Sequence, residues 1–267
     1  MKYKALVLDI DGTLVVHGEP AARPEVVRAV KEAQRQGLAI VIATGRTYFA
    51  MSKEILGGIV PDFALCANGA QVIDREGRLL TNSAFTPEEM YALVDYFEDF
   101  DYPLAFCYSD NYYVYVEFER MREFYKVATG HDEYVLDGED QTRHLQDMPF
   151  GAFGIIPPEK LEDFDARYGY LGLQFAAYKP GYYDIMQKGV NKGHGLEELM
   201  KRKGWKKEEL IAIGDSDNDV SMLELAGLSY CMQNGSEASK AAADRIAPHV
   251  KDNGVAAAIR EVLANEL

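Results

Sequence analysis

Two aspartates at the end of a short apolar run have the types and spacing that suit catalysis. The run Ala5–Leu8 leads into Asp9, Ile10, Asp11 and Gly12. An apolar run of this length predicts a buried strand, and the glycine lets the chain curl so that both carboxylates point into one pocket. An Asp-Gly pair after a strand also predicts a simple turn. A turn explains Asp11 but leaves Asp9, a charge at the end of a buried strand, without the partner it needs.

A second group of acids follows another apolar run, Leu210–Ile213. Residues 214–219 read Gly-Asp-Ser-Asp-Asn-Asp and put three carboxylates in one loop. A helix cap uses one acid rather than three, so their mutual repulsion argues for a bound cation. Oxygen ligands without cysteine or histidine suit a hard cation, and few carboxylates with room for water suit Mg²⁺. Asp215, Asn218 and Asp219 therefore join Asp9 and Asp11 as candidate site residues.

Two further segments supply groups that bind anions. Thr44, Gly45 and Arg46 follow the apolar run Leu38–Ala43, so a threonine hydroxyl and two backbone N–H groups lie at a strand end. Lys192 lies between glycines before a predicted helix, which is a position typical of an anion site. Simpler interpretations stay open: Thr44 as a helix N-cap, Lys192 as a solvated charge, and Arg46 as a partner for a carboxylate of the middle region.

The elements that must position these residues follow an alternating pattern. The run of residues 5–8 is followed by a helix that begins at Pro24 and ends at Gly37, and then by the continuous apolar run of residues 38–43. This is a strand–helix–strand unit, which favours a parallel sheet buried on both faces. Further apolar strands are predicted at residues 63–67, 210–213 and 228–232. We therefore predict an α/β fold, a Rossmann-like parallel sheet whose strand ends share one edge.

The composition changes in the middle of the chain. Most of its 17 tyrosines lie between residues 82 and 185, where the pattern becomes α+β. Strands with alternating tyrosines predict an antiparallel sheet with one solvated or ligand-facing side, and a helix with a capped start is predicted at Thr86. We predict a core domain of residues 1–81 and 186–267 and an inserted domain of residues 82–185. Some of the aromatic side chains there are expected to hold the organic part of a substrate.

The composition also limits the function. The chain of 267 residues has a net charge of −15, which repels nucleic acid and anionic membranes and leaves small diffusible substrates. Its longest clean apolar run, residues 38–43, is far shorter than the ~20 residues of a spanning helix. Three cysteines without metal-ligand spacing predict neither a disulfide framework nor a zinc site. With no leader segment expected before the first strand, we predict a cytoplasmic protein, a monomer or a homodimer.

Electrostatics then indicates a mechanism. A divalent cation, a lysine and a threonine form a phosphate-binding set. Two like charges ~4 Å apart repel by roughly 4 kcal/mol at a protein-like dielectric, and a phosphate dianion near Asp9 meets more than that. Mg²⁺ and Lys192 must offset this repulsion before a carboxylate can attack phosphorus. Asp9 is then the candidate nucleophile that forms an aspartyl-phosphate, and Asp11 the candidate acid and base.

At this point the sequence resembles a known family. Asp-x-Asp-Gly-Thr, the strand-end Thr44, Lys192 and the segment of residues 214–219 are similar, in order, to the four motifs of haloacid dehalogenase-like phosphatases. Residues 43–46, 68–70 and 188–193 resemble the Cof-type subfamily with its large α+β cap. The resemblance implies Asp9 as nucleophile and metal ligand, and Asp11 as acid/base that also binds metal through its backbone carbonyl.

The resemblance also implies the remaining roles. Asp215 would complete the metal site, with Asn218 and Asp219 beside it. Thr44 and Lys192 would hold the phosphate, and Asn218 would contact the phosphate. Family members are Mg²⁺-dependent phosphatases that act on sugar phosphates or phosphorylated cofactors. Two alternatives remain: a phosphomutase of the same fold, and a phospho-aspartate regulatory module. A regulatory module has no use for an acid/base at Asp11 or for a large aromatic cap.

Overall fold

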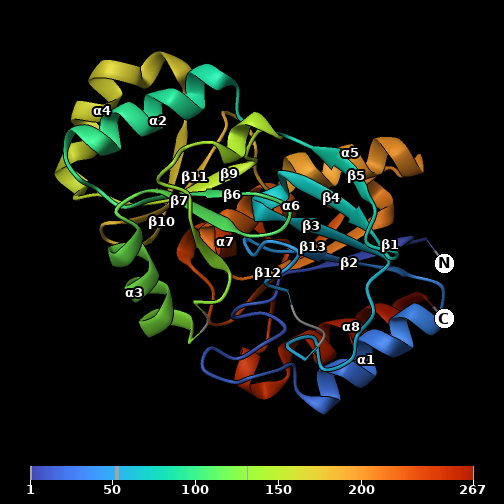
Figure 1. The fold of residues 1–267 in the computed structure, drawn as a ribbon. Coiled ribbons are helices and arrows are strands. Elements are labelled where there is room, and N and C mark those ends of the chain that lie inside the picture. Colours follow the sequence, from blue (N-terminus) through green and yellow to red (C-terminus); the bar gives the residue numbers. More distant parts are fainter. Residues whose placement is uncertain (1, 52–53, 131, 267) are drawn as a thin grey trace. The chain divides into compact units, whose positions relative to one another are not determined.

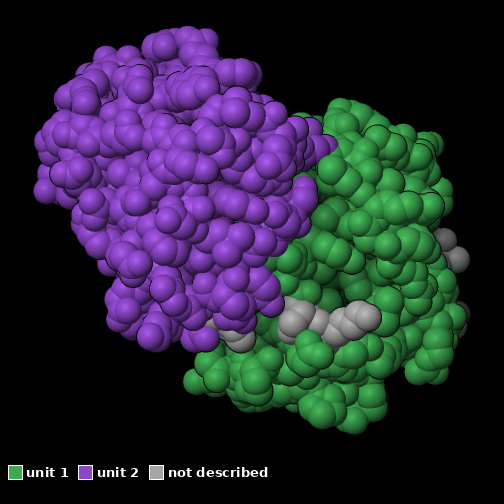
Figure 2. Space-filling view, in the orientation of Figure 1, with its two compact units in different colours: residues 1–81, 191–267 green, residues 82–190 purple. Residues whose placement is uncertain are grey.

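The chain forms two compact units, which Figure 2 shows in different colours. The computed structural model describes residues 2–51, 54–130 and 132–266. The core unit comprises residues 1–81 and 191–267, and the inserted unit comprises residues 82–190. The sequence placed the second boundary five residues earlier. Met186 pairs with Gln174 in the sheet of the inserted unit, and Gln187 Nε2 donates a hydrogen bond to Glu89 Oε2 at 2.8 Å, so this stretch belongs to the insertion.

An eight-stranded sheet forms the centre of the core unit. Its order is β14-β13-β12-β1-β2-β3-β4-β5. The strands from β14 to β3 pair in parallel, whereas β4 runs antiparallel to β3. Their bounds are β1 Ala5–Leu8, β2 Ala39–Ala43, β3 Phe63–Cys66, β4 Gln71–Asp74, β5 Leu79–Asn82, β12 Leu210–Gly214, β13 Leu228–Met232 and β14 Arg245–Ala247. The predicted α/β fold with a parallel core sheet is confirmed.

Helices cover both faces of this sheet (Figure 1). Successive residues of a strand point to opposite faces, and because the residues of β1 are apolar throughout, both faces need an apolar cover. Leu6 and Leu8 of β1 pack in a core cluster with α1 (Pro24–Arg35) and α8 (Gly254–Glu266). Ala5 and Val7 pack in a second cluster with α5 (Lys192–Lys203) and α6 (Val220–Leu225). The short helix α7 (Glu237–Ala242) follows β13. Within the described residues, no helix is long and apolar enough to cross a membrane.

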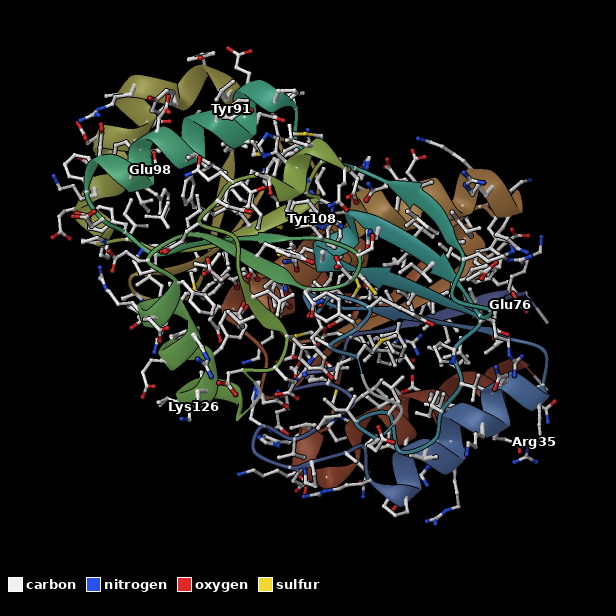
Figure 3. All side chains as sticks on the ribbon, in the orientation of Figure 1. Arg35, Glu76, Tyr91, Glu98, Tyr108 and Lys126 are labelled. Atoms are coloured by element: carbon white, nitrogen blue, oxygen red, sulfur yellow. The ribbon has the colours of Figure 1, made fainter. Side chains whose placement is uncertain are left out.

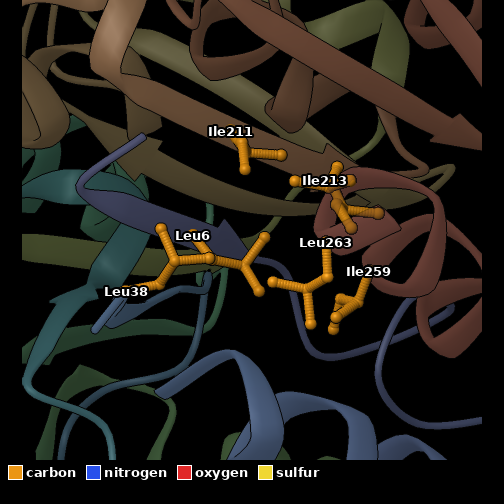
Figure 4. Close-up of a pocket in the computed structure, with 7 residues that line it drawn as sticks. Leu6, Leu38, Ile211, Ile213, Ile259 and Leu263 are labelled. Carbon is orange, nitrogen blue, oxygen red and sulfur yellow. The ribbon is translucent and has the colours of Figure 1, made fainter. Parts of the chain in front are cut away.

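An apolar gap between the sheet and α8 is part of the core packing. Figure 4 shows that its labelled lining residues come from β1, β12, α8 and the residue before β2. All seven lining residues are aliphatic: Leu6, Leu38, Ile211, Ile213, Ile259, Val262 and Leu263. Because ligand sites combine apolar walls with a few polar groups, this gap is not a candidate site.

The inserted unit has a six-stranded sheet in the order β10-β11-β9-β6-β7-β8. The predicted antiparallel pairing holds from β10 to β7, but β8 pairs in parallel with β7. Figure 1 shows α2 and α4 together, away from α3. The elements are α2 Pro87–Asp99, β6 Leu104–Cys107, β7 Tyr112–Val116, α3 Phe118–Thr129, β8 Val135–Asp137, β9 Gly151–Ile155, α4 Leu161–Tyr168, β10 Gln174–Lys179 and β11 Tyr182–Met186. A capping box between Thr86 and Glu89 confirms the predicted start of α2.

Many tyrosines of the inserted unit are core residues whose hydroxyl groups are paired internally. Tyr108 and Tyr115 are buried, and their hydroxyl oxygens lie 3.1 Å apart. The Tyr115 hydroxyl also lies 3.1 Å from His144 Nδ1, and Tyr91 Oη lies 2.9 Å from His144 Nε2. Figure 3 labels Tyr91 on α2 and Tyr108 after β6. Buried hydroxyl groups need hydrogen-bond partners, and these tyrosines find them inside the unit. Tyr108 and Tyr115 are therefore part of its core packing.

Candidate active site

The ends of three neighbouring strands bring most of the candidate residues to one edge of the core sheet. Leu8, the last residue of β1, pairs with Ile213 of β12 on one side and Ile42 of β2 on the other. The loops after these strands therefore start at nearly the same level, with Asp9 in the middle. The strand order also reverses between β1 and β12, which is the kind of position where open α/β sheets bind ligands.

Lys192 joins two of the carboxylates at this edge. It is the first residue of α5, which begins after Asn191, whose side chain accepts a hydrogen bond from the backbone of His194. Its Nζ lies 2.6 Å from Asp9 Oδ1 and 2.6 Å from Asp219 Oδ1. All three side chains are almost completely buried, at 1%, 6% and 0% exposure for Lys192, Asp9 and Asp219. A buried lysine in two ion pairs is not a solvated surface charge.

The cluster around Asp9 contains more negative than positive charge. Burial raises the pKa of Asp9 well above its ordinary range, and the ion pair with Lys192 opposes this while Asp219 and Asp215 add to it. Burial alone would lower the pKa of Lys192, but its pairs with Asp219 and Asp9 outweigh burial and raise it. Lys192 is therefore firmly protonated, yet one ammonium group does not offset three carboxylates.

Asp215 completes the group of carboxylates. Its Oδ1 accepts a hydrogen bond from Thr13 Oγ1 at 2.6 Å. Burial raises the pKa of Asp215 to about 6, against the hydrogen bond from Thr13, which lowers it. Gly12 has a φ of +93°, and a Cβ there would lie 2.2 Å from Asp215 Oδ2. Glycine is therefore required beside this carboxylate both for its backbone conformation and for space.

These carboxylates fit a hard divalent cation. Asp9, Asp215 and Asp219 each offer an oxygen within 4.8 Å of the others. Asp9 Oδ2 is buried and has no hydrogen-bond partner among the described residues, which is costly unless a ligand satisfies it. Both oxygens of Asp219 are engaged, one by Lys192 and the other by the backbone N–H groups of Asp215 and Ser216. Asp9 and Asp215 therefore have the oxygens best suited to such a cation.

The carboxylate of Asp11 lies outside this group. Arg46 holds it in a two-pronged ion pair, with Nε and Nη2 each 2.8 Å from one of the two oxygens. The Asp11 side chain is also 39% exposed. The sequence predicts that Asp9 and Asp11 point into one pocket and leaves open that Arg46 pairs with a carboxylate of the insertion. The structure pairs Arg46 with Asp11, and a planar guanidinium matches both carboxylate oxygens.

The candidate phosphate ligands lie on loops beside the carboxylates. Thr44 is 1% exposed, and its Oγ1 accepts a hydrogen bond from the backbone of Arg46 at 3.1 Å. Asn218 lies in a short 3-10 turn, Asp217–Asp219, at the end of β12. Its Nδ2 donates to Asn68 Oδ1 at 2.9 Å, and its Oδ1 accepts from Ser216 Oγ at 2.9 Å. The polar groups on these loops thus hold one another in place.

Three residues at the site were not assigned a site role from the sequence. Thr13 bonds Asp215, as described, and its place in Asp-x-Asp-Gly-Thr was the available signal. Asn234 Nδ2 donates to the carbonyl of Gly12 at 2.8 Å, and its Oδ1 accepts from the backbone of Val250 at 2.9 Å. No local pattern marks Asn234, because it comes from the loop after β13. Asn68 follows β3, and the signal for it was its place in the segment of residues 68–70 that resembles the Cof-type subfamily.

Comparison with known proteins decides the family. The family model described as haloacid dehalogenase-like hydrolase matches residues 6–259. The chain belongs to this family. The match covers both units, so the insertion is part of the family's architecture. The family predicted from the sequence is thus confirmed.

Relatives that match over nearly the full chain are named as phosphatases. Phosphatase YwpJ of Bacillus subtilis is 28% identical over 97% of this chain and 100% of its own length. The 5-amino-6-(5-phospho-D-ribitylamino)uracil phosphatase YcsE of the same organism is 26% identical, over 96% and 94%. The solved structure of the subclass IIB sugar phosphatase BT4131 superposes with a TM-score of 0.80 at 26% identity, covering 97% of this chain and 98% of that one. The predicted enzyme class agrees with these relatives.

Proposed function

We propose that this hydrolase is a Mg²⁺-dependent phosphatase that hydrolyses small phosphomonoesters through an aspartyl-phosphate on Asp9. The observation that carries the proposal is the environment of the Asp9 carboxylate. One oxygen bonds Lys192 at 2.6 Å, and the other is buried without a partner among the described residues. Asp9 also offers an oxygen within 4.8 Å of one from Asp215. This arrangement supports a nucleophile that shares a cation with Asp215.

The first step is phosphoryl transfer to Asp9. A carboxylate oxygen of Asp9 attacks phosphorus while the bond from phosphorus to the ester oxygen breaks, and the leaving oxygen takes a proton from Asp11. Bound Mg²⁺, held by Asp9 and Asp215, would neutralise charge on the phosphoryl group. Lys192 supplies a further positive charge, and the proposed phosphate ligands are Thr44 and the backbone N–H of Gly45, with Asn218 on the other side.

The second step regenerates the carboxylate. Asp11 takes a proton from water, the water oxygen attacks phosphorus, and the bond between phosphorus and Asp9 breaks to release inorganic phosphate. Both oxygens of Asp11 are occupied by Arg46 in the structure. Each oxygen keeps a further lone pair that can take a proton, and we propose that the Asp11 side chain turns toward Asp9 for the proton transfer in each step.

The substrate class is proposed from the relatives. Their names include a sugar phosphatase and a phosphatase of a phosphorylated ribitylaminouracil. We propose small phosphorylated metabolites of this kind, such as sugar phosphates or phosphorylated cofactors, and a role in the cytoplasm. The inserted unit acts as a cap that selects among them.

A variant of the nucleophile tests the proposal. We expect Asp9→Asn to abolish phosphate release from p-nitrophenyl phosphate while the fold is retained, because an amide neither attacks phosphorus nor binds Mg²⁺ as a carboxylate does. We expect EDTA to abolish wild-type activity and Mg²⁺ to restore it. Wild-type turnover by Asp9→Asn, or undiminished turnover after chelation, would contradict the mechanism. With a hexose phosphate as substrate, formation of an isomer without free phosphate would indicate a mutase instead.

A further inference from the structure

Asn68 touches several of the groups that we propose as phosphate ligands. It is 3% exposed, and its Oδ1 accepts the hydrogen bond from Asn218 Nδ2 at 2.9 Å. Its backbone N–H donates to the carbonyl oxygen of Thr44 at 3.0 Å. A Cβ on Gly45 would lie 3.3 Å from Asn68 Oδ1, so the side-chain amide lies directly against Gly45. One buried side chain thus connects the loop after β2 with the loop after β12.

The backbone around Asn68 has an uncommon conformation. Ala67, Asn68 and Gly69 have φ values of 48°, 53° and 88°, so three consecutive residues lie in the left-handed region. Residues other than glycine visit this region singly rather than in runs. The segment is held by a hydrogen bond from the backbone of Ala67 to the carbonyl of Arg46 at 2.9 Å. Strain of this kind persists where the surrounding structure imposes it, and it clusters at ligand sites.

The same segment also contacts the start of α5. A Cβ on Gly69 would lie 2.2 Å from the carbonyl oxygen of Asn191, the residue before Lys192. The strained turn is therefore in contact with three loops that carry proposed phosphate-binding groups. An ordinary turn between β3 and β4 needs no buried amide and no such contacts.

We infer that Asn68 is a positioning residue that sets the distance between the Thr44–Gly45 loop and Asn218, so that both face one phosphate group. This inference rests on the proposed phosphatase function and adds a residue to its site. Asn68 acts by holding Asn218 against the Thr44–Gly45 loop and does not touch the reacting atoms. Without its amide, the two loops lose their shared contact, and phosphate binding weakens while the fold and the metal-binding carboxylates are retained.

The variant Asn68→Gly tests this, because glycine keeps the left-handed backbone and removes only the side chain. We expect the Ki for orthovanadate and the KM for p-nitrophenyl phosphate to rise about 10- to 100-fold, as for other supporting residues around a site, with a smaller change in kcat. A matched control is Asn253→Gly. Asn253 also has a left-handed φ, of 56°, and precedes α8. We expect wild-type Ki and KM in that control.

A double-mutant cycle with Asn218→Ala locates the effect. If Asn68 acts through Asn218, the double variant Asn68→Gly/Asn218→Ala should bind vanadate within about twofold of Asn218→Ala alone. Additive losses, or wild-type vanadate affinity in Asn68→Gly, would overturn the inference. An active wild type with an unaffected Asn68→Gly contradicts this inference alone, whereas a wild type that releases no phosphate contradicts the proposed function and this inference with it.

A second variant covers the case in which Asn68→Gly does not fold. Asn68→Asp has the same shape, tolerates a left-handed φ and keeps the oxygen that accepts from Asn218. Its new negative charge would lie against Gly45, beside the bound phosphate. We expect its Ki for vanadate to rise at least about 10-fold and to respond to salt. An unchanged Ki in Asn68→Asp would show that Asn68 lies too far from the phosphate to position its ligands.

Discussion

Replacing Lys192 by methionine removes the ammonium group between Asp9 and Asp219 and should destabilise the metal-free protein. At an effective dielectric of about 20, each contact of 2.6 Å is an attraction of about 6 kcal/mol. Relief of the buried lysine's desolvation offsets part of this, and removing one partner of a buried ion pair costs about 3–5 kcal/mol. We therefore expect the free energy of unfolding of Lys192→Met to fall by about 3–5 kcal/mol at pH 8 without Mg²⁺.

The pH dependence of this loss identifies its cause. Burial already raises the pKa of Asp9 and Asp215 in the folded state. A carboxyl group with a raised pKa in the folded state binds more protons there than in the unfolded chain, so it adds stability as the pH falls. The difference between Lys192→Met and wild type should therefore be smaller at pH 5 than at pH 8, and Mg²⁺ should reduce it at pH 8.

Urea unfolding at both pH values, with and without Mg²⁺, measures these differences. The matched control is Lys201→Met on the same helix, where the lysine is 68% exposed and pairs with Glu198. Surface pairs of this kind contribute at most about 1 kcal/mol. A Lys192→Met protein within about 1 kcal/mol of wild type at pH 8 without Mg²⁺, or one with a pH-independent loss, would refute the reasoning.

Two further predictions concern the carboxylates that we propose as metal ligands. Because the pKa of Asp215 is raised from 3.8 to about 6, the metal-free protein should lose up to about 3 kcal/mol of stability as the pH rises from about 4 to 6. Mg²⁺ affinity should in turn weaken below about pH 6, since the ion competes with the proton on Asp215. Urea titrations measure the stability and calorimetry measures the Mg²⁺ affinity. If neither quantity changes with pH over this range, the raised pKa of Asp215 is contradicted. Gly12→Ala places a Cβ 2.2 Å from Asp215 Oδ2 on a backbone with φ of +93°. We expect it to weaken Mg²⁺ binding at least about 10-fold by calorimetry, whereas Gly18→Ala, also at positive φ but with no atom near its Cβ, should bind Mg²⁺ as wild type does.

The strand-end residues were predictable because their placement depends on the parallel sheet. Apolar runs before Asp9, Thr44 and Asp215 predicted buried strands, and the ends of parallel strands meet at one edge. The contact between Lys192 and Asp9 follows from the start of α5 at the same edge. The family motifs and the topology therefore led to the same residues.

Other features depend on side-chain directions and on distant loops. The pairing of Asp11 with Arg46 is set by the turn at Gly12, whose geometry the residue types leave open. Asn234 reaches Gly12 from a loop more than 200 residues along the chain, and no spacing rule connects them. The end of the insertion lay later than predicted because the side chain of Gln187 bonds α2, a contact that no local pattern indicates.

Trapping the phosphorylated enzyme tests the central claim most directly. Acid quenching during turnover of a labelled phosphomonoester, followed by fragmentation mass spectrometry, locates any phosphoryl group on the chain. Our account predicts a phosphoryl group on Asp9 in the Mg²⁺-loaded wild type and none in Asp9→Asn. Phosphate release with no phosphorylated enzyme, or a phosphoryl group on a residue other than Asp9, would contradict it.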